Sequence, residues 1–181
     1  MHANFDAIVI GAGQAGPSLA ARLDAQGMRV AMIERKHFGG TCVNTGCRPT
    51  KTMVASAYAA HMARRGADYG FSVAGPVSVD MRRVHARAQE IIMHSRDGVM
   101  RWMQGLQHGQ VFQGHARFES RDTVRVGEDR LSAPQIFLDV GGRARIPAMP
   151  GLDRVPYFTN TGMMDIDFLP EHLVVVGGSY V

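Results

Sequence analysis

The chain has few cysteines and no long apolar run. Only two of its 181 residues are cysteine, Cys42 and Cys47, which excludes the disulfide-dense framework of small secreted domains. No stretch approaches the ~20 consecutive apolar residues that span a bilayer. The N-terminus carries no basic region, and its first apolar run, residues 7–10, is too short for the core of a signal peptide. We therefore expect a cytoplasmic protein with no membrane partner.

The sequence also lacks the patterns of common zinc and nucleic-acid sites. Its eight histidines and two cysteines form neither an HExxH pattern nor a pair of CxxC patterns, so we expect no structural zinc. The formal net charge is only +4, and the arginines of residues 64–87 are separated by apolar residues without interleaved aromatics. A solvated helix face explains these arginines better than a nucleic-acid surface, so we expect no nucleic-acid partner.

Apolar runs and glycines predict an α/β fold. Residues 5–35 predict a strand, a glycine turn, a helix and a second strand, which is one βαβ unit of a parallel sheet. Residues 50–66 and 79–106 predict two helices. Residues 109–142 alternate short β-rich runs with Gly, Asp and Pro, which predicts a small antiparallel β-meander. The expected fold class is therefore a Rossmann-like domain with a parallel sheet and this meander.

The C-terminal part predicts a domain boundary. The 181 residues, 45% of them hydrophobic, suffice for one well-buried domain but not for two. Prolines then mark a linker, and residues 172–181 repeat the strand and glycine turn of residues 6–15. We divide the chain into a domain of residues 1–150, a linker of residues 151–171, and the start of a second nucleotide-binding domain at residues 172–181. A domain does not normally end inside such a turn, so we expect a longer protein.

A glycine pattern predicts a dinucleotide site. Gly11, Gly13 and Gly16 form GxGxxG between the first strand and the helix, where glycines permit a tight turn and close approach of a pyrophosphate. The N–H groups of the helix N-terminus favour phosphate, and Pro17 costs little in the first helical turn. Glu34 ends the second strand, where a carboxylate can bind a ribose 2′-hydroxyl. This pattern alone does not distinguish FAD from NAD.

The two cysteines lie in the segment GGTCVNTGCRPTK, residues 39–51. A disulfide between Cys42 and Cys47 closes a very small loop and gains little chain entropy, so it is a poor device for stability. A metal site needs more ligands than two thiolates, and none is obvious nearby. Cys47 also lies at the start of a predicted helix, whose dipole favours a thiolate. These residues favour a redox dithiol, while metal binding and a structural role stay open.

The segment of residues 39–51, following a βαβ unit that ends in Glu34, closely resembles the active-site segment of the FAD-dependent pyridine nucleotide–disulfide oxidoreductases. The chain looks most like the mercuric-reductase-like branch, and the resemblance covers essentially its whole length. It implies FAD as cofactor, NAD(P)H as co-substrate and a homodimer at full length. It also implies that residues 1–150 bind FAD and that residues 172–181 begin an NAD(P)-binding domain.

The resemblance assigns three catalytic positions. Cys42 matches the interchange thiol, which exchanges with substrate, and Cys47 matches the charge-transfer thiol, which faces the flavin. Lys51 matches a lysine near the reactive edge of the flavin. Arg48 departs from the family, which commonly has an apolar residue there. An inward arginine would stabilise a neighbouring thiolate, but we expect Arg48 to point to solvent.

The resemblance also assigns residues to each part of FAD. They are Gly11, Gly13 and Gly16 at the pyrophosphate, Glu34 at the adenosine ribose, Gly40 and Thr41 beside the disulfide, Lys51 and Gly141 at the flavin, and Ala116 at the adenine. Asp139 and Val140 lie where relatives often have Ala-Thr before this last glycine. The assignment of Gly141 therefore depends on a pattern that the chain follows only in part.

The implied reaction passes electrons from NAD(P)H through FAD and the Cys42–Cys47 pair to a disulfide, lipoamide or Hg(II). The rest of the nicotinamide domain and an acid–base pair of the family are not found in these 181 residues, so we expect no full turnover from this chain alone. Two alternatives stay open. One is a flavin- or nucleotide-binding module without redox activity, and the other is a thiol-based binder of soft metals.

Overall fold

A parallel sheet forms the centre of the computed structural model, which describes residues 2–178. Its strand order is β4-β3-β2-β8, and every neighbouring pair is parallel. The strands are β2 (Ala7–Ile10), β3 (Val30–Glu34), β4 (Gly109–Gln113) and β8 (Gln135–Leu138). The βαβ unit predicted from residues 5–35 is therefore confirmed.

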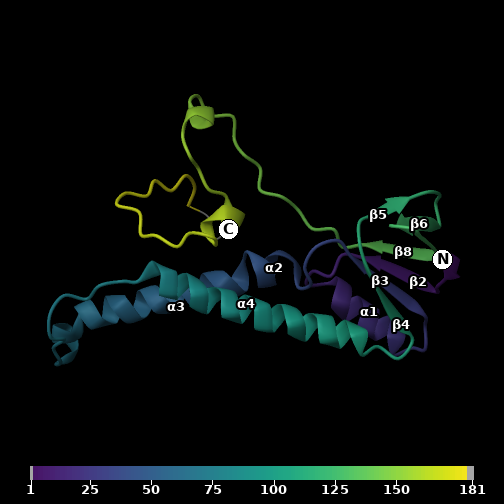
Figure 1. Cartoon of the computed structure of the whole chain (residues 1–181), viewed down its shortest axis with the longest axis horizontal. Helices are drawn as coiled ribbons and strands as arrows, with labels where there is room; N and C mark the ends of the chain where they lie inside the picture. Colours follow the sequence, from purple (N-terminus) through teal and green to yellow (C-terminus); the bar gives the residue numbers. More distant parts are fainter. Residues whose placement is uncertain (1, 179–181) are drawn as a thin grey trace.

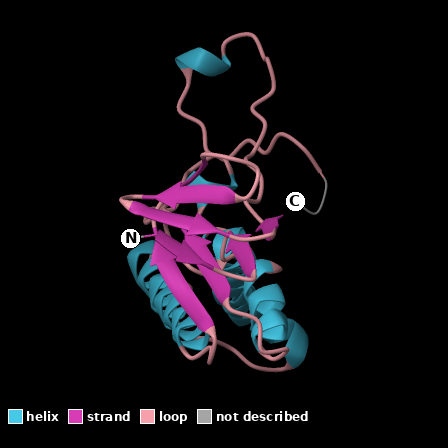
Figure 2. Ribbon diagram, turned by 90° about the vertical axis from the view of Figure 1, so that its right-hand side faces the viewer, coloured by secondary structure: helices cyan, strands magenta, loops and turns pink. Residues whose placement is uncertain are grey.

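Helices cover one face of this sheet, and a second sheet covers the other (Figure 2). Side chains alternate between the two faces along a strand. Val9 packs with Ala20 and Met103 from the helices. Its neighbour Ile8 points the other way and packs with Leu131 of the second sheet. This two-sided burial explains why β2 and β3 are continuous apolar runs.

The helix layer contains two short and two long helices. They are α1 (Gly16–Asp24), α3 (Cys47–Arg64) and α4 (Met81–Gln104), with the short α2 (Gly40–Asn44) before α3 and the 3₁₀ turn η1 (Gly66–Tyr69) after it. Helices α3 and α4 lie side by side and extend away from the sheets (Figure 1). Asp80 caps α4 by accepting a hydrogen bond from the backbone N–H of Arg83 at 3.1 Å. Among residues 2–178 we find no helix that is long and apolar enough to cross a membrane.

The second sheet contains the predicted meander in a smaller form. Its order is β1-β7-β6-β5, in which β5, β6 and β7 are antiparallel neighbours and β1 is parallel to β7. The strands are β1 (His2–Asn4), β5 (Ala116–Phe118), β6 (Thr123–Val126) and β7 (Asp129–Ser132). The outer strands of residues 109–142, β4 and β8, belong instead to the parallel sheet. Local alternation predicts a strand but not its partner.

The C-terminal segment contains little regular structure. Its elements are η2 (Leu152–Arg154) and α5 (Asn160–Met163). Buried Met164 anchors the segment to α3 through a contact of 3.6 Å between its Sδ and the hydroxyl of Thr50. Residues 172–178, where the sequence predicts a strand, contain none in the structure. A strand needs neighbours for its backbone groups, and no strand of the described chain pairs with these residues. Residues 179–181 lie outside the described part.

Candidate dithiol site

The glycine turn begins where β2 ends. Gly11 adopts a φ of +110°, and a Cβ there would collide with the carbonyl group of Asp139. A Cβ on Gly40 would lie 2.7 Å from the Cα of Gly13. These two contacts join the turn to β8 on one side and to the cysteine segment on the other. Gly11 and Gly40 are thus required by close approach of the protein's own backbone, whereas the sequence predicts the glycines of the turn for a tight turn and for close approach of a pyrophosphate.

The cysteine segment docks onto the glycine turn through the main chain. The N–H of Gly39 donates to the carbonyl of Ala12 at 2.7 Å, and Gln14 Nε2 donates to the carbonyl of Gly39 at 3.2 Å. Since Gly39 precedes α2, these bonds hold the first turn of α2 against the glycine turn. The structure therefore brings the cysteine segment, through Gly39 and Gly40, beside the turn that the sequence predicts to bind a pyrophosphate.

A disulfide joins Cys42 of α2 to Cys47, the first residue of α3, with the two Cα atoms 4.6 Å apart. The close approach depends on Gly46, where a Cβ would lie 2.9 Å from the carbonyl oxygen of Thr41. Helix α3 begins three residues earlier than predicted, because Pro49 is tolerated in a first turn whose N–H groups have no helical partners. Cys47 is exposed at this N-terminus and Cys42 is half-buried. After reduction, the helix N-terminus favours a thiolate at Cys47.

Asn44 and Arg96 hold the turn between the cysteines in place. Asn44 Nδ2 donates to the carbonyls of Phe38 and Gly40 at 3.0 and 2.8 Å. Its Oδ1 accepts from Arg96 Nε of α4 at 2.9 Å. Sequence reasoning missed both residues. The position of Asn44 between the cysteines was a usable signal, whereas Arg96 lies 52 residues away in an ordinary helical pattern.

Glu34 is hydrogen-bonded to the protein backbone on both of its carboxylate oxygens. Oε2 accepts from Ala12 N at 2.9 Å, and Oε1 accepts from Lys36 N at 2.7 Å. The carbonyl of Glu34 accepts from Gly114 N at 2.9 Å, which brings half-buried Ala116 near the same edge. The structure thus gathers the predicted ribose and adenine positions beside the glycine turn.

Three other predicted residues are exposed. Lys51 lies one helical turn after Cys47 on α3, and Thr41 lies beside Cys42 on α2. Gly141 follows the end of β8 by three residues and has a φ of +67°. Arg48 is exposed too, as we expect, and lines a groove with Val43, His94 and Trp102. This groove lies next to the disulfide in sequence, because Val43 and Arg48 each follow a cysteine.

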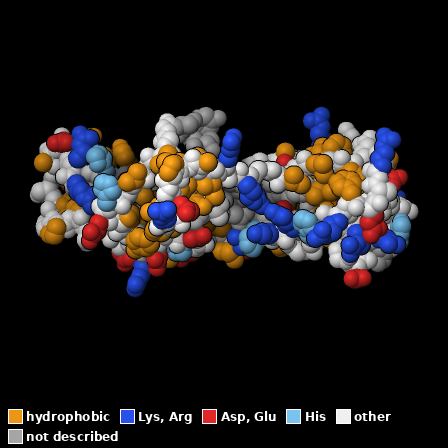
Figure 3. All heavy atoms as spheres, turned by 90° about the horizontal axis from the view of Figure 1, so that it is seen from above, with side chains coloured by type: hydrophobic (Ala, Val, Ile, Leu, Met, Phe, Trp, Pro, Cys, Tyr) orange, Lys and Arg blue, Asp and Glu red, His pale blue; other side chains and the backbone are white. Residues whose placement is uncertain are grey.

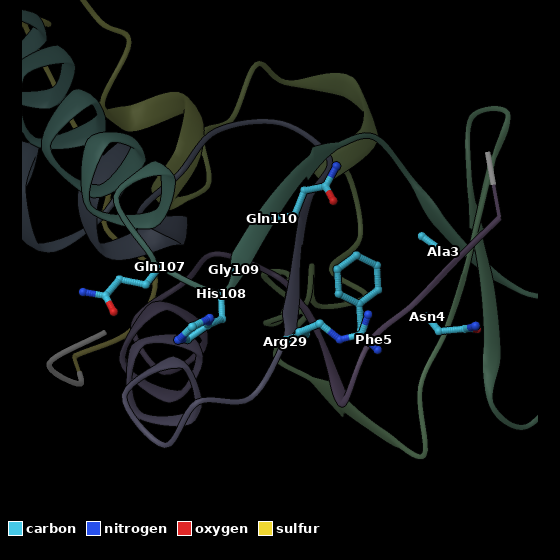
Figure 4. A pocket seen from close by; sticks show the side chains of 8 residues that line it. All are labelled: Ala3, Asn4, Phe5, Arg29, Gln107, His108, Gly109 and Gln110. Atoms are coloured by element: carbon cyan, nitrogen blue, oxygen red, sulfur yellow. The ribbon is translucent and has the colours of Figure 1, made fainter.

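A second pocket lies at the other end of the strands of the parallel sheet (Figure 4). Its lining includes Phe5, Arg29, His108 and Gly109. Arg29 precedes β3 and Gly109 begins β4, so this pocket lies at the amino ends of the strands. Ligands of open α/β sheets bind outside the carboxyl ends, where the glycine turn and the disulfide are found. The dithiol site is therefore the better candidate. Among residues 2–178, no group of three or more His, Cys, Asp or Glu side chains is arranged to hold a metal ion.

Comparison with known proteins gives consistent matches. A family model described as pyridine nucleotide-disulphide oxidoreductase matches residues 5–181. The mercuric reductase of Bacillus cereus is 30% identical over 178 residues, which cover 98% of this chain and 28% of that protein. The probable pyridine nucleotide-disulfide oxidoreductase RclA of Escherichia coli K12 is 31% identical over 184 residues, covering 98% of this chain and 38% of that protein.

A solved structure has the same fold. It is the HOCl-induced flavoprotein disulfide reductase RclA from Escherichia coli, with a TM-score of 0.74 and 30% identity. The alignment covers 91% of this chain and 35% of that one. The chain thus spans about a third of the length of the relatives that it matches.

Proposed function

We propose, because this chain belongs to the pyridine nucleotide–disulphide oxidoreductase family, that it is the FAD-binding, dithiol-bearing part of an NAD(P)H-dependent flavoprotein. Its Cys42–Cys47 pair would pass electrons to a small-molecule disulfide, lipoamide or Hg(II). The observation that carries the proposal is the docking of this disulfide segment onto the glycine turn, through the bond from Gly39 to Ala12. A binding module without redox activity has no need of a thiol pair at this place.

The glycine turn fits FAD in its chemistry, since it leads into the N-terminus of α1, where backbone N–H groups and the helix dipole favour a pyrophosphate. When bound, FAD supplies electron transfer between a nicotinamide and the disulfide. The residues that would hold it are Gly11, Gly13 and Gly16 at the pyrophosphate, Glu34 at the ribose, Ala116 at the adenine, Gly40 and Thr41 beside the disulfide, and Lys51 and Gly141 at the flavin.

The protein residues then have separate tasks in disulfide exchange. Reduction of the Cys42–Cys47 bond takes two electrons and two protons and leaves two thiols. The Cys42 thiolate attacks one sulfur of a substrate disulfide and releases the first substrate thiolate. The Cys47 thiolate, favoured at the N-terminus of α3, then attacks the sulfur of Cys42. This step releases the second thiolate and restores the original disulfide. Lys51, one helical turn from Cys47, adds a positive charge that favours the thiolate.

Residues 172–178 support the proposed domain division at residues 1–150, 151–171 and 172–181. Gly177 has a φ of +117°, close to the +110° of Gly11, and both follow a short apolar run. Val174, Val175 and Val176 are 69–74% exposed. Figure 3 shows hydrophobic side chains on the surface over the C-terminal segment. We propose that a larger NAD(P)-binding domain buries these valines. A homodimer of the full-length protein is likewise a proposal, as is a cytoplasmic location, which suits thiols that must be reduced in each cycle.

The visible spectrum of the chain with FAD, before and after dithiothreitol, tests the function. We expect a protein-bound flavin band and, on reduction, a long-wavelength shoulder that disappears in the Cys47→Ser variant. Cys42→Ser is the matched control, because it also breaks the disulfide but keeps the Cys47 thiol. A bound flavin whose spectrum ignores the state of the thiols would contradict the redox proposal and favour a passive binding module.

A further inference from the structure

A carboxylate occupies the phosphate-binding end of α1. Asp139 Oδ2 accepts a hydrogen bond from the backbone N–H of Gly16, the first residue of α1, at 2.7 Å. The backbone of Asp139 is fixed as well, because its N–H donates to the carbonyl of Ile10 at 2.8 Å. This N–H of Gly16 is among the few at a helix start that have no helical partner and are free to bind an anion.

The same carboxylate fills part of the space that the glycines leave open. A Cβ built on Gly16 would lie 3.0 Å from Asp139 Oδ2, and one on Gly13 would lie 3.3 Å from it. In a dinucleotide turn the space at the second glycine, here Gly13, lets the backbone approach the pyrophosphate, whereas the third glycine, here Gly16, permits close helix–strand packing. In the described part of the chain, Asp139 has no ion-pair partner among the Lys and Arg side chains. The hydrogen bond that its carboxylate accepts from the turn is therefore the one from the N–H of Gly16.

Glu34 adds a second carboxylate at the other end of the turn. Its Oε2 accepts from the N–H of Ala12 at 2.9 Å. Acidic side chains thus accept hydrogen bonds from the N–H groups of both Ala12 and Gly16 in the turn. The two differ in their relation to FAD, because a carboxylate at the position of Glu34 can bind ribose hydroxyls, whereas one at Gly16 competes with phosphate.

We propose that Asp139 is a built-in anion that competes with the cofactor pyrophosphate for the N-terminus of α1 and so determines how tightly the turn binds FAD. The inference rests on the proposed function. A pyrophosphate brings negative charge to a place that already holds a carboxylate. Binding therefore requires Asp139 to release the N–H of Gly16 and turn away, or to remain at the cost of charge repulsion. Without the cofactor, the same carboxylate caps α1 and stabilises the empty turn.

The dissociation constants of FAD, ADP and riboflavin test the proposal in Asp139→Asn and Asp139→Ala variants of the whole 181-residue chain. We expect both variants to bind FAD and ADP roughly fivefold more tightly or better, as removal of a like charge at a helix terminus suggests. Riboflavin has no phosphate, so its dissociation constant should not change. Asp153→Asn, which removes an equal charge from exposed residue 153 in η2, is the matched control and should bind all three ligands as the wild type does.

Thermal unfolding without ligand provides a second readout, in which the substitution should lower stability although it strengthens FAD binding. Asp139→Ala removes the cap of α1, so its melting temperature should fall by about 2–4 °C even though FAD binds more tightly. Equal or weaker FAD binding by Asp139→Asn would overturn the proposal, as would an equal gain for riboflavin. If the wild type binds as tightly as the variants and shows the thiol-dependent spectrum, only this inference fails. If no variant binds flavin or ADP, the proposed function fails with it.

Discussion

Asn44 connects the loop before α2, α2 itself and α4 around the cysteine pair. It donates to the carbonyls of Phe38 and Gly40 and accepts from Arg96. The Asn44→Ala substitution leaves all three groups without this partner, and a part-buried group that loses its hydrogen bond costs about 1–3 kcal/mol. We expect a loss of that size in the free energy of unfolding, measured by urea denaturation. Asn160→Ala, at an exposed position of α5, should change it by less than about 0.5 kcal/mol.

The pair can be tested for coupling as well. Arg96→Ala and the double variant with Asn44→Ala complete a thermodynamic cycle. If the hydrogen bond at 2.9 Å is the link between α2 and α4, the double variant should lose less stability than the sum of the two single variants. Additive losses would mean that each residue acts through other contacts.

The two thiols differ in exposure, and this difference predicts their order of reaction. Cys47 is exposed at the start of α3, whereas Cys42 is half-buried in α2. In the reduced chain without FAD, we expect iodoacetamide to alkylate Cys47 first, because it is both accessible and favoured as a thiolate. With FAD bound against Cys47, the order should reverse. Mass spectrometry of the peptides after brief alkylation gives the order directly. An unchanged order with saturating FAD would contradict the placement of Cys47 against the flavin.

At the scale of elements, the close approach of α2 and α3 depends on Gly46, a glycine that is not needed for a left-handed turn. Gly46 has a negative φ, yet a Cβ there would lie 2.9 Å from the carbonyl oxygen of Thr41 and 3.3 Å from the Cα of Cys42. Gly46→Ala should therefore push the two helices apart and lower the free energy of unfolding by about 1–3 kcal/mol. The expected loss is measured by urea denaturation of the oxidised chain.

Gly98→Ala is the matched control for this prediction. Gly98 lies inside α4, where an added Cβ meets nothing within 4 Å. Alanine is the better helix former, so the variant should gain up to about 1 kcal/mol. Equal effects of the two substitutions would show that glycine flexibility, and not the close approach of α2 and α3, determines the result at Gly46.

The helices and strands also show how much of the fold local sequence patterns can predict. The sequence predicts β2, α1, β3 and the two long helices, because their apolar periods reflect burial within a single element. It does not predict that β4 and β8 join the parallel sheet, since strand propensity contains no information about the partner strand. At the site, the glycines and cysteines are close in sequence and form motifs. The bonds from Arg96 to Asn44 and from Gly16 to Asp139 join residues 52 and 123 positions apart, which no local pattern reveals.

At the scale of the whole molecule, the candidate functional residues lie together at the carboxyl ends of the parallel strands. The glycine turn follows β2, Glu34 ends β3, and Asp139 follows β8. Helix α2 is held over this edge by the bond from Gly39 to Ala12. The long pair α3 and α4 extends beyond it, and the C-terminal segment arches over the start of α3 (Figure 1). The arrangement holds a dithiol beside the glycine turn but leaves the valines of residues 174–176 exposed.

This architecture predicts that thiol chemistry and full turnover can be separated. The chain spans about a third of the length of its relatives, and we propose that most of the nicotinamide site lies in the remainder. With FAD added, dithiothreitol should reduce the Cys42–Cys47 bond, giving two free thiols per chain by thiol titration. NADH or NADPH should not reduce this bond, so the same titration should detect no free thiols above its noise. Reduction by NAD(P)H that disappears in Cys42→Ser would show instead that these 181 residues contain a working nicotinamide site. Residues 172–178 would then have a structural role other than the first strand of a second domain.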